Sequence, residues 1–413
     1  MCLAITAIPS PTGTERPLAE WIVERLRRTG IDADLQVFDE TRANVVARRP
    51  GRGDGRSLLL YSSIDTAFPI DRDATGGAPG AGDTPPLAPG ARRSGDWIVG
   101  PGAENPKGFA TAVIGAFEAL CASPLDLAGD VVLALTAGGM PTPDRPDRPG
   151  SGGLGRGCRE FLEHGARPDA AVIAKPGDAV STEEVGIALF RLRVSGDLGY
   201  TGTRHRGPVR HAVRDAARLV ERLETWFPVY TAERATATLA PQGAVTAIAG
   251  GWPDRPAFLP AACDVWVDLR TVPGMTLDDA RAALQAVVDG AAADLDCDVA
   301  ITLLGGFPGA STPADAPIVR SAIRAWESRT GRQHVPITGT SGVTDASILR
   351  AAGIPTARIG MPRPAEAAPY PGFSMGVVSI GSMAALAETL VDIAVDTVGP
   401  AHSTPSSVTE INA

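Results

Sequence analysis

The chain has 413 residues, of which 44% are hydrophobic and 21% are charged, and 38 Lys and Arg against 47 Asp and Glu give a formal net charge of −9. This composition excludes a disordered or fibrous protein, and the length allows two or three domains around a sizeable core. The acidic balance argues against a nucleic-acid-binding protein, which would present a basic face.

The sequence also predicts where the protein is found. No apolar run approaches the roughly 20 residues that span a bilayer. The first residues, MCLAITAIPSPTG, have no basic segment before an apolar one, so we expect no secretory signal. Five cysteines, none in a CxxC pair, indicate free thiols in a reducing compartment. Together these features predict a cytoplasmic protein.

The first 185 residues alternate predicted helices and strands. An amphipathic helix is expected over residues 15–29, where Leu18, Ile22 and Leu26 share one face. Similar patterns predict strands over 33–38, 44–47, 57–61, 129–136 and 169–174, helices over 107–123 and 155–165, and loops over 62–69, 71–99 and 141–153. This alternation predicts an α/β layer structure with mostly parallel pairing.

The pattern changes near residue 186. Strands are predicted over 187–195, 243–249, 263–269 and 298–303, with helices over 209–226 and 276–291. This β-α-β-β-α-β order is typical of a ferredoxin-like unit. The α/β alternation then resumes, with helices over 314–329, 344–352 and 381–397 and a strand over 356–359. We therefore predict a discontinuous domain of residues 1–185 and 306–397, an inserted domain of residues 186–305 and a flexible tail over 398–413.

Six phrases of the sequence, in order, resemble the zinc-dependent family of aminoacylases, acetylornithine and succinyl-diaminopimelate deacylases, and glutamate carboxypeptidases. They are IPSPTGTE (8–15), NVVAR (44–48), LLLYSSIDTAFP (58–69), GPGAENPKG (100–108), VDLRTVPG (267–274) and TDASILRAAGIPTARIG (344–360). The resemblance covers about residues 5–397. It implies an α/β/α catalytic domain of the zinc exopeptidase kind and an inserted ferredoxin-like α+β lid through which the family dimerises.

The resemblance also implies two zinc ions that share a carboxylate and activate a water for a glutamate base. Here other residues stand at the positions that correspond to the family's zinc ligands and glutamate base. Ser63 stands at the first histidine, shortly before the family's aspartate (Asp65), and Asn105 stands at the bridging aspartate. Gly139 and Met140 stand at the Glu-Glu pair, Lys175 stands at the next acidic ligand, before Pro176, and the last histidine falls near Gly372. None of these replaces imidazole or carboxylate on zinc. We expect no binuclear metal site and no cofactor. A mononuclear site made of His205, His211 and Asp345 is the alternative.

The resemblance implies that Ser63, Asn105 and Lys175 converge. The Lys175 ammonium would polarise a carbonyl where zinc stood, or a neutral Lys175 would take the Ser63 proton in a Ser–Lys dyad for acyl transfer. Asn105 would orient Ser63 or donate to an oxyanion, and Asp65 would hold Lys175 charged. The structural alternative is a lysine that neutralises an acidic pocket around Asp65, beside a serine retained for its small size.

Further residues are predicted to bind the substrate. Arg270, in VDLRTVPG, resembles the lid arginine that clamps a substrate carboxylate, and a salt bridge to Asp268 or Glu221 is its alternative. The stretch YTGTRHRGPVRH (200–211) reaches a neighbouring active site across the family's dimer, or is a solvated helix start. We select from it Tyr200, at the lid histidine, with His205 and His211. The N–H groups of the loop 338–345 would cradle a carboxylate through Gly339, Thr340 and Ser341, unless Thr344 simply caps the following helix.

Three functions remain open. The first is a metal-independent enzyme that acts on the amide or acyl group of a small carboxylate-bearing amino-acid derivative or short peptide, by hydrolysis, acyl transfer, condensation or cyclisation. The second is a catalytically inactive relative that binds such a ligand or a partner. The third is an ordinary zinc amidohydrolase. We favour the first, because a new charged group stands at the centre of the site. We also expect a homodimer through the lid, and neither nucleic acid nor a membrane as partner.

Overall fold

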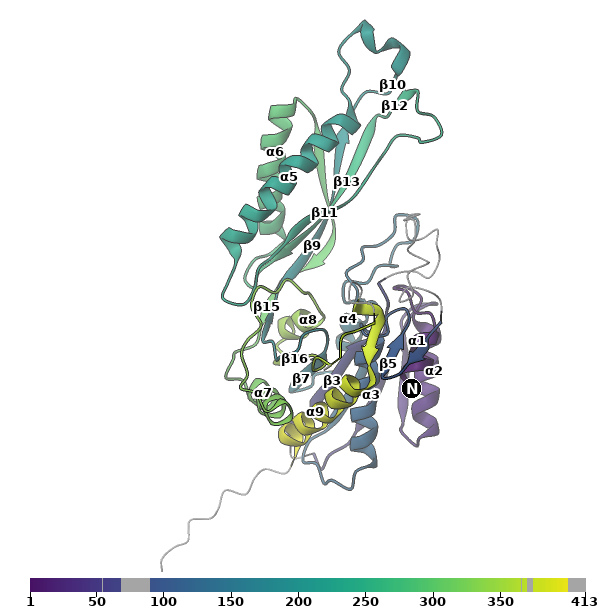
Figure 1. Cartoon of the computed structure of the whole chain (residues 1–413), viewed down its shortest axis with the longest axis vertical. Coiled ribbons are helices and arrows are strands. Elements are labelled where there is room, and N and C mark those ends of the chain that lie inside the picture. Colours follow the sequence, from purple (N-terminus) through teal and green to yellow (C-terminus); the bar gives the residue numbers. More distant parts are fainter. Residues whose placement is uncertain (54, 68–89, 365, 370–373, 400–413) are drawn as a thin grey trace, which may run out of the picture.

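The computed structural model describes residues 1–53, 55–67, 90–364, 366–369 and 374–399. Two bodies are visible in Figure 1, one around a six-stranded sheet and one around a four-stranded sheet. Within the described residues, no helix is long and apolar enough to cross a bilayer.

The larger body is built on a mixed sheet with the strand order β1-β2-β6-β3-β7-β16. The strands are β1 (Ala33–Val37), β2 (Ala43–Arg49), β3 (Leu58–Ser63), β6 (Val131–Thr136), β7 (Ala170–Ala174) and β16 (Thr356–Ile359). β6, β3, β7 and β16 are parallel to one another, whereas β1 and β2 pair antiparallel. Parallel strands are covered on both faces, which explains their continuous apolar runs.

Helices cover both faces of this sheet. One core joins Leu58 and Leu60 of β3 to α1 (Cys2–Ala7), α2 (Arg16–Arg28), α3 (Lys107–Ala122), α7 (Pro317–Thr330) and α9 (Ile380–Val398). On the other face, Leu59 and Tyr61 pack with α4 (Arg156–Glu163) and α8 (Ala346–Ala351). Alternate residues of β3 therefore face different cores, as the pleat of a strand requires.

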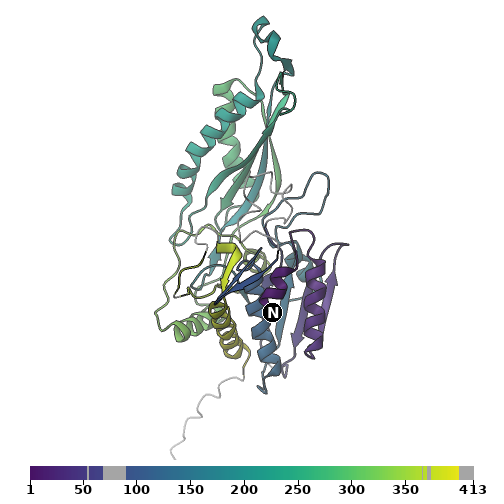
Figure 2. The ribbon, with the colours of Figure 1, turned by 45° about the vertical axis from the view of Figure 1, so that its right-hand side comes forward.

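The smaller body is an antiparallel sheet with the strand order β11-β13-β9-β14. Its strands are β9 (Gly186–Ser195), β11 (Gly243–Gly250), β13 (Ala262–Thr271) and β14 (Val299–Phe307), and its helices are α5 (Ala212–Arg234) and α6 (Leu277–Leu295). Both helices cover one face and share one core with the sheet. Figure 2 shows this lid extending away from the larger body. The predicted ferredoxin-like lid is confirmed.

Several strands are too short to be predicted from the sequence, because two or three residues show no periodicity. These are β4 (Arg92–Ser94), β5 (Trp97–Val99), β8 (Glu183–Glu184), β10 (Gly199–Tyr200), β12 (Phe258–Leu259), β15 (Ala310–Ser311) and β17 (Val377–Ser379), with the 3₁₀ turns η2 (Thr201–Arg206) and η3 (Ser374–Gly376). The loop predicted over 71–99 is therefore wrong at its end, and its residues 71–89 lie outside the described residues.

Three predicted boundaries are also wrong. The loop expected from residue 62 begins later, because β3 continues through Ser63 along β6. α5 continues past Pro228 to Arg234, because its apolar face still buries Tyr230 beyond the proline. α9 includes Val398, which is buried, so the predicted tail begins later; its residues 400–413 lie outside the described residues.

Candidate functional site

The candidate site lies at the carboxyl ends of the parallel strands β3 and β7. Ser63 is the last residue of β3 and follows Tyr61 on the same face. Lys175 comes directly after β7 and follows Ile173 in the same way. Because the two strands are parallel neighbours, both side chains emerge at one edge of the sheet, where α/β folds bind ligands.

The structure brings Ser63, Lys175 and Asn105 together. The Nζ of Lys175 donates to the Oγ of Ser63 at 2.7 Å and approaches the Oδ1 of Asn105 at 3.4 Å. Asn105 comes from the loop that leads into α3. Because the amide oxygen faces the lysine, the Nδ2 of Asn105 is directed elsewhere, and it forms no hydrogen bond with the described residues.

The pair of Ser63 and Lys175 is almost entirely buried. Ser63 is 0% exposed and Lys175 is 4% exposed. Burial lowers the pKa of Lys175, and this effect outweighs the opposing charges of Asp345, Asp65 and Glu184. The shift favours the neutral amine, which is the form that accepts a proton.

Asp65 organises the loop after β6. Its Oδ1 accepts from the N–H of Gly139, and its Oδ2 accepts from the N–H of Met140 and the hydroxyl of Thr12, each at 2.8 Å. Among the described residues it forms no hydrogen bond with Lys175, so its influence there is long-range charge. Glu15 binds the same loop through the N–H of Gly138, and burial together with the Asp65 charge raises its pKa to about 8.

A buried tyrosine–aspartate pair adjoins Ser63. The hydroxyl of Tyr61 donates to the Oδ2 of Asp345 at 2.5 Å and also bonds the hydroxyl of Thr136. The Oδ1 of Asp345 is buried without a hydrogen-bonding partner in the described part of the chain, and burial raises the pKa of this carboxyl to about 7. Tyr61 is not among the predicted site residues, because the strand expected over 57–61 ends before Ser63 and gives the two side chains no common face; β3 in fact continues through Ser63.

Gly139 separates Ser63 from Asp345. A Cβ atom at this position would lie 2.5 Å from the Cβ of Ser63 and 3.1 Å from the Oδ2 of Asp345. No side chain fits here unless Ser63 moves. The expected Glu-Glu position is therefore closed by packing, and Met140 beside it is buried.

The predicted lid residues lie far from Ser63 within the chain. Tyr200, in β10, packs on Phe258 with ring centroids 5.8 Å apart, and Figures 1 and 2 place β10 and β12 at the far end of the lid. His205 is exposed in η2, and the Nδ1 of His211 caps α5 by accepting from the N–H of Arg214 at 3.2 Å. Asp345 is buried in the other body, so the alternative mononuclear site of His205, His211 and Asp345 does not form within the chain.

Arg270 is already engaged by other residues. Its Nε and Nη2 donate to the two carboxylate oxygens of Asp268 at 2.7 and 2.8 Å, and its Nη1 donates to the carbonyl of Ser341 at 3.3 Å. This ion pair was the predicted alternative to a substrate clamp.

The loop with Gly339, Thr340 and Ser341 pairs with a neighbouring segment. The N–H of Thr340 donates to the carbonyl of Thr238 at 3.0 Å, and the hydroxyl of Ser341 accepts from the N–H of Gln242. Gly339 adopts a positive φ of 68°, a conformation that suits glycine. The N–H of Thr340 is therefore not free for a ligand.

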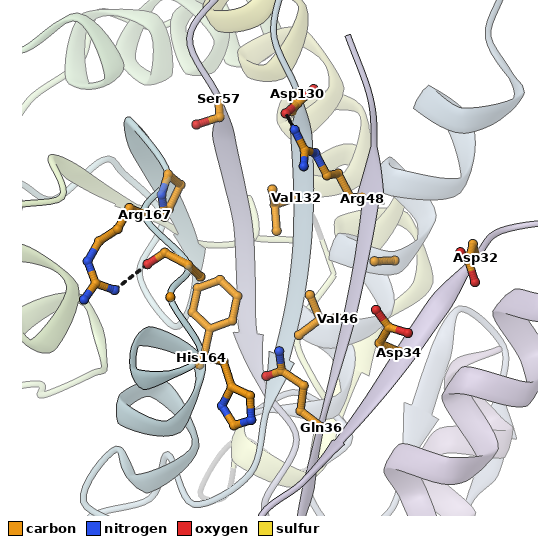
Figure 3. A pocket seen from close by; sticks show the side chains of 15 residues that line it. Asp32, Asp34, Gln36, Val46, Arg48, Ser57, Asp130, Val132, His164 and Arg167 are labelled. Carbon is orange, nitrogen blue, oxygen red and sulfur yellow. Dashed lines mark hydrogen bonds and ion pairs between the residues drawn. The ribbon is translucent and has the colours of Figure 1, made fainter. Parts of the chain in front are cut away.

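In the described part of the chain, no three His, Cys, Asp or Glu side chains lie close enough together to hold a metal ion. Gly372, near the position of the last expected histidine, lies outside the described residues. A cavity of about 490 Å³ is shown in Figure 3, and none of the predicted site residues lines it. Ser57, Asp130 and Pro168 line it and precede β3, β6 and β7, so it lies at the opposite edge of the sheet.

Comparisons with known proteins find similar sequences and folds. A family model described as "Peptidase family M20/M25/M40" matches residues 60–395. The di-peptidase Dug1p of Saccharomyces cerevisiae is 12% identical, with 97% of this chain and 95% of that chain covered and a TM-score of 0.73. Human carnosine dipeptidase 1 is 14% identical, with 95% of each chain covered and a TM-score of 0.69. Aminopeptidase PepT of Bacillus cereus ATCC 10987 is 14% identical, with 96% of each chain covered and a TM-score of 0.66. At these identities the solved structures show likeness of fold.

Proposed function

The chain belongs to peptidase family M20/M25/M40, and from this premise we propose that it acts on the amide or acyl group of a small amino-acid derivative or short peptide, with Ser63 and Lys175 in place of zinc. The observation that supports this proposal is the 2.7 Å contact between the Nζ of Lys175 and the Oγ of Ser63. A lysine that accepts a serine proton makes that serine a nucleophile.

The side chains at the site do not fit a pair of zinc ions. The Nζ of Lys175 lies within 3.4 Å of both Ser63 and Asn105, the positions that correspond to zinc ligands in the family resemblance, and neither a hydroxyl nor an amide replaces imidazole or carboxylate there. Gly139 offers no ligand and leaves no room for one.

In the proposed reaction, neutral Lys175 takes the proton of Ser63 as its Oγ attacks the carbonyl carbon. The Nδ2 of Asn105 donates to the oxygen that becomes negative. The C–N bond then breaks, and Lys175 returns the proton to the leaving amine. Water then attacks the acyl-serine with Lys175 again as base. The C–O bond to Ser63 breaks, Lys175 returns the proton to the Oγ of Ser63, and the carboxylic acid is released.

A second candidate function is the binding of such a ligand without turnover. It is supported by the complete burial of Ser63, because a substrate can reach the hydroxyl only if neighbouring groups move. The two functions share one pocket and differ in whether Ser63 reacts.

Turnover of N-acetyl amino acids and dipeptides in the presence of a chelator distinguishes the candidates. We expect activity to survive chelation and to fall by roughly 10³-fold in both Ser63→Ala and Lys175→Met, because the pair acts as a unit. Lys107→Met is the matched control. It makes the same substitution at another buried lysine, whose Nζ donates to the carbonyl of Ile8 at 2.6 Å and not to Ser63.

Three results would contradict this mechanism. Activity that is lost on chelation and restored by zinc would indicate a metal enzyme. Full turnover in Ser63→Ala and Lys175→Met would remove both residues from the reaction. Saturable binding without turnover would favour the second candidate.

A further inference from the structure

A second cationic side chain, Arg358, faces the same side of the sheet as Ser63 and Lys175. Its neighbours Ala357 and Ile359 belong to the core on the opposite face. In β16 it is in register with Ile173 of β7. Lys175 lies one strand away and two residues further on, so the two Cα atoms are roughly 8 Å apart.

Within the described ranges, the Arg358 guanidinium has a side-chain partner on its Nε side. The Nε lies 3.2 Å from the Oε1 of Glu184, whose Oε2 accepts from the N–H and the hydroxyl of Thr344 at 3.1 and 2.6 Å. In the described part of the chain, neither Nη1 nor Nη2 forms a hydrogen bond. A guanidinium with both terminal nitrogens free presents the fork that matches a carboxylate.

The free nitrogens adjoin two glycines. A Cβ atom on Gly342 would lie 3.5 Å from Nη1 and, among the described residues other than its chain neighbours, would meet no further atom within 4 Å. A Cβ atom on Gly177 would lie 3.2 Å from the Cδ1 of Ile337 and 3.6 Å from Nη2. Gly177 follows Lys175 and Pro176 in the loop after β7, so the fork opens next to the candidate site.

Two buried arginines, Arg350 and Arg358, share the carboxylate of Glu184 near this fork. Among the described residues, Arg350 donates its hydrogen bonds to neutral oxygens, including the carbonyl of Thr356 at 3.1 Å. Arg270, by contrast, is already neutralised by Asp268.

We propose that the Nη1 and Nη2 of Arg358 bind the carboxylate of the substrate and thereby hold its amide beside Ser63 and Lys175. This inference rests on the proposed function and narrows the substrate class to acylated amino acids and peptides with a free carboxylate near the reacting amide. It assigns to Arg358 the role that the family resemblance predicts for Arg270.

The test measures binding by calorimetry in full-length protein with Ser63→Ala, which prevents turnover. The probes are a set of N-acetyl-L-amino acids and their neutral α-carboxamides. We expect at least one acid to bind about tenfold or more tightly than its amide, as two charge-assisted hydrogen bonds require. Arg358→Gln should abolish this preference and leave amide binding within about twofold. Arg270→Gln, the matched control, should retain it.

Three results would overturn the proposal: equal affinity for acid and amide, no saturable binding of any acid, or loss of the preference in Arg270→Gln instead of Arg358→Gln. If Arg358→Gln does not fold because Glu184 is left unpaired, Glu184→Gln with Arg358→Gln removes both partners and gives the same comparison. Turnover with native Ser63 is measured separately. Acid preference without turnover would leave Arg358 in place and contradict only the acyl-transfer mechanism.

Discussion

At the scale of single residues, burial determines the properties of the candidate site. Lys175 donates to Ser63 where almost no water reaches either group, so the pKa of the amine falls although carboxylates are near. Asp345 is also buried, but burial changes its pKa in the opposite direction, because burial raises the pKa of a carboxyl. Burial therefore shifts the pKa of each residue toward its neutral form.

Asp345 is expected to make stability depend on pH. Its carboxyl has a pKa of about 7 in the folded protein and an ordinary value of 3.8. Between these values the folded protein keeps a proton that the unfolded chain has lost, so the free energy of unfolding falls as pH rises. In thermal denaturation, we expect the Tm to fall more steeply in the wild type than in Asp345→Asn between about pH 5 and about pH 7.

Asp169→Asn is the control for this measurement. Hydrogen bonds from the N–H and hydroxyl of Ser57 lower the pKa of Asp169, so this carboxyl titrates below the range compared. The Asp169→Asn variant should change the Tm, but it should not change how steeply the Tm falls between about pH 5 and about pH 7. Identical slopes in Asp345→Asn and the wild type would refute the assignment. Neither Asp345 nor Asp169 is among the groups that shift the pKa of Glu15, so we expect its contribution to the slope to be the same in all three proteins.

At the scale of elements, the loop after β6 packs directly against the end of β3. Gly139→Ala would place a methyl group 2.5 Å from the Cβ of Ser63. We expect the variant to lose activity because Ser63 is displaced, and to lose about 1–3 kcal/mol of stability from overpacking. Urea denaturation and turnover measure the two effects.

Gly290→Ala is the control for Gly139→Ala, because Gly290 has room for a methyl group. Gly290 lies inside α6, and no atom lies within 4 Å of the position of its Cβ. Alanine should stabilise the protein by roughly 0.5–1 kcal/mol, because glycine costs more backbone entropy in a helix. Unchanged activity in Gly139→Ala would show that the loop does not position Ser63.

At the scale of the whole molecule, two bodies with separate cores are joined. The lid core draws only on residues 188–303. Ile187 pairs with Phe307, so the chain enters and leaves the lid at adjacent points. We propose on this basis that the lid is an inserted domain within the discontinuous domain of residues 1–185 and 306–397. We also propose that the edge strand β11, where Ile248 is 51% exposed, forms the interface of a homodimer.

The isolated segment 186–307 tests both proposals. We expect it to unfold cooperatively on heating, as followed by circular dichroism, because it contains a complete core. Sedimentation should show a dimer that Ile248→Lys converts to a folded monomer, since a charge on an edge strand opposes pairing. An unfolded segment would contradict the division into domains, and a monomeric parent segment would contradict the interface.

Local patterns in the sequence determined the fold class, because periodicity and turn residues act over a few neighbours. The α/β alternation, the ferredoxin-like order and the helix of α2 all follow from such patterns. The same patterns fail where an element is too short or where a distant contact decides its end. β4 and β5 are too short to show a period, and α5 passes Pro228 because Tyr230 is buried beyond it.

Only the tertiary structure decided which side chains meet. The family resemblance placed Ser63, Lys175 and Asn105 together, but the buried pair of Tyr61 and Asp345, and the free fork of Arg358, depend on strand register and on loops distant in sequence. For Arg270 the sequence predicts either a carboxylate clamp or a salt bridge to Asp268 or Glu221, and the structure shows the pair with Asp268 on the same strand. A side chain's partner depends on which groups folding brings within hydrogen-bonding distance, and local sequence does not contain that information.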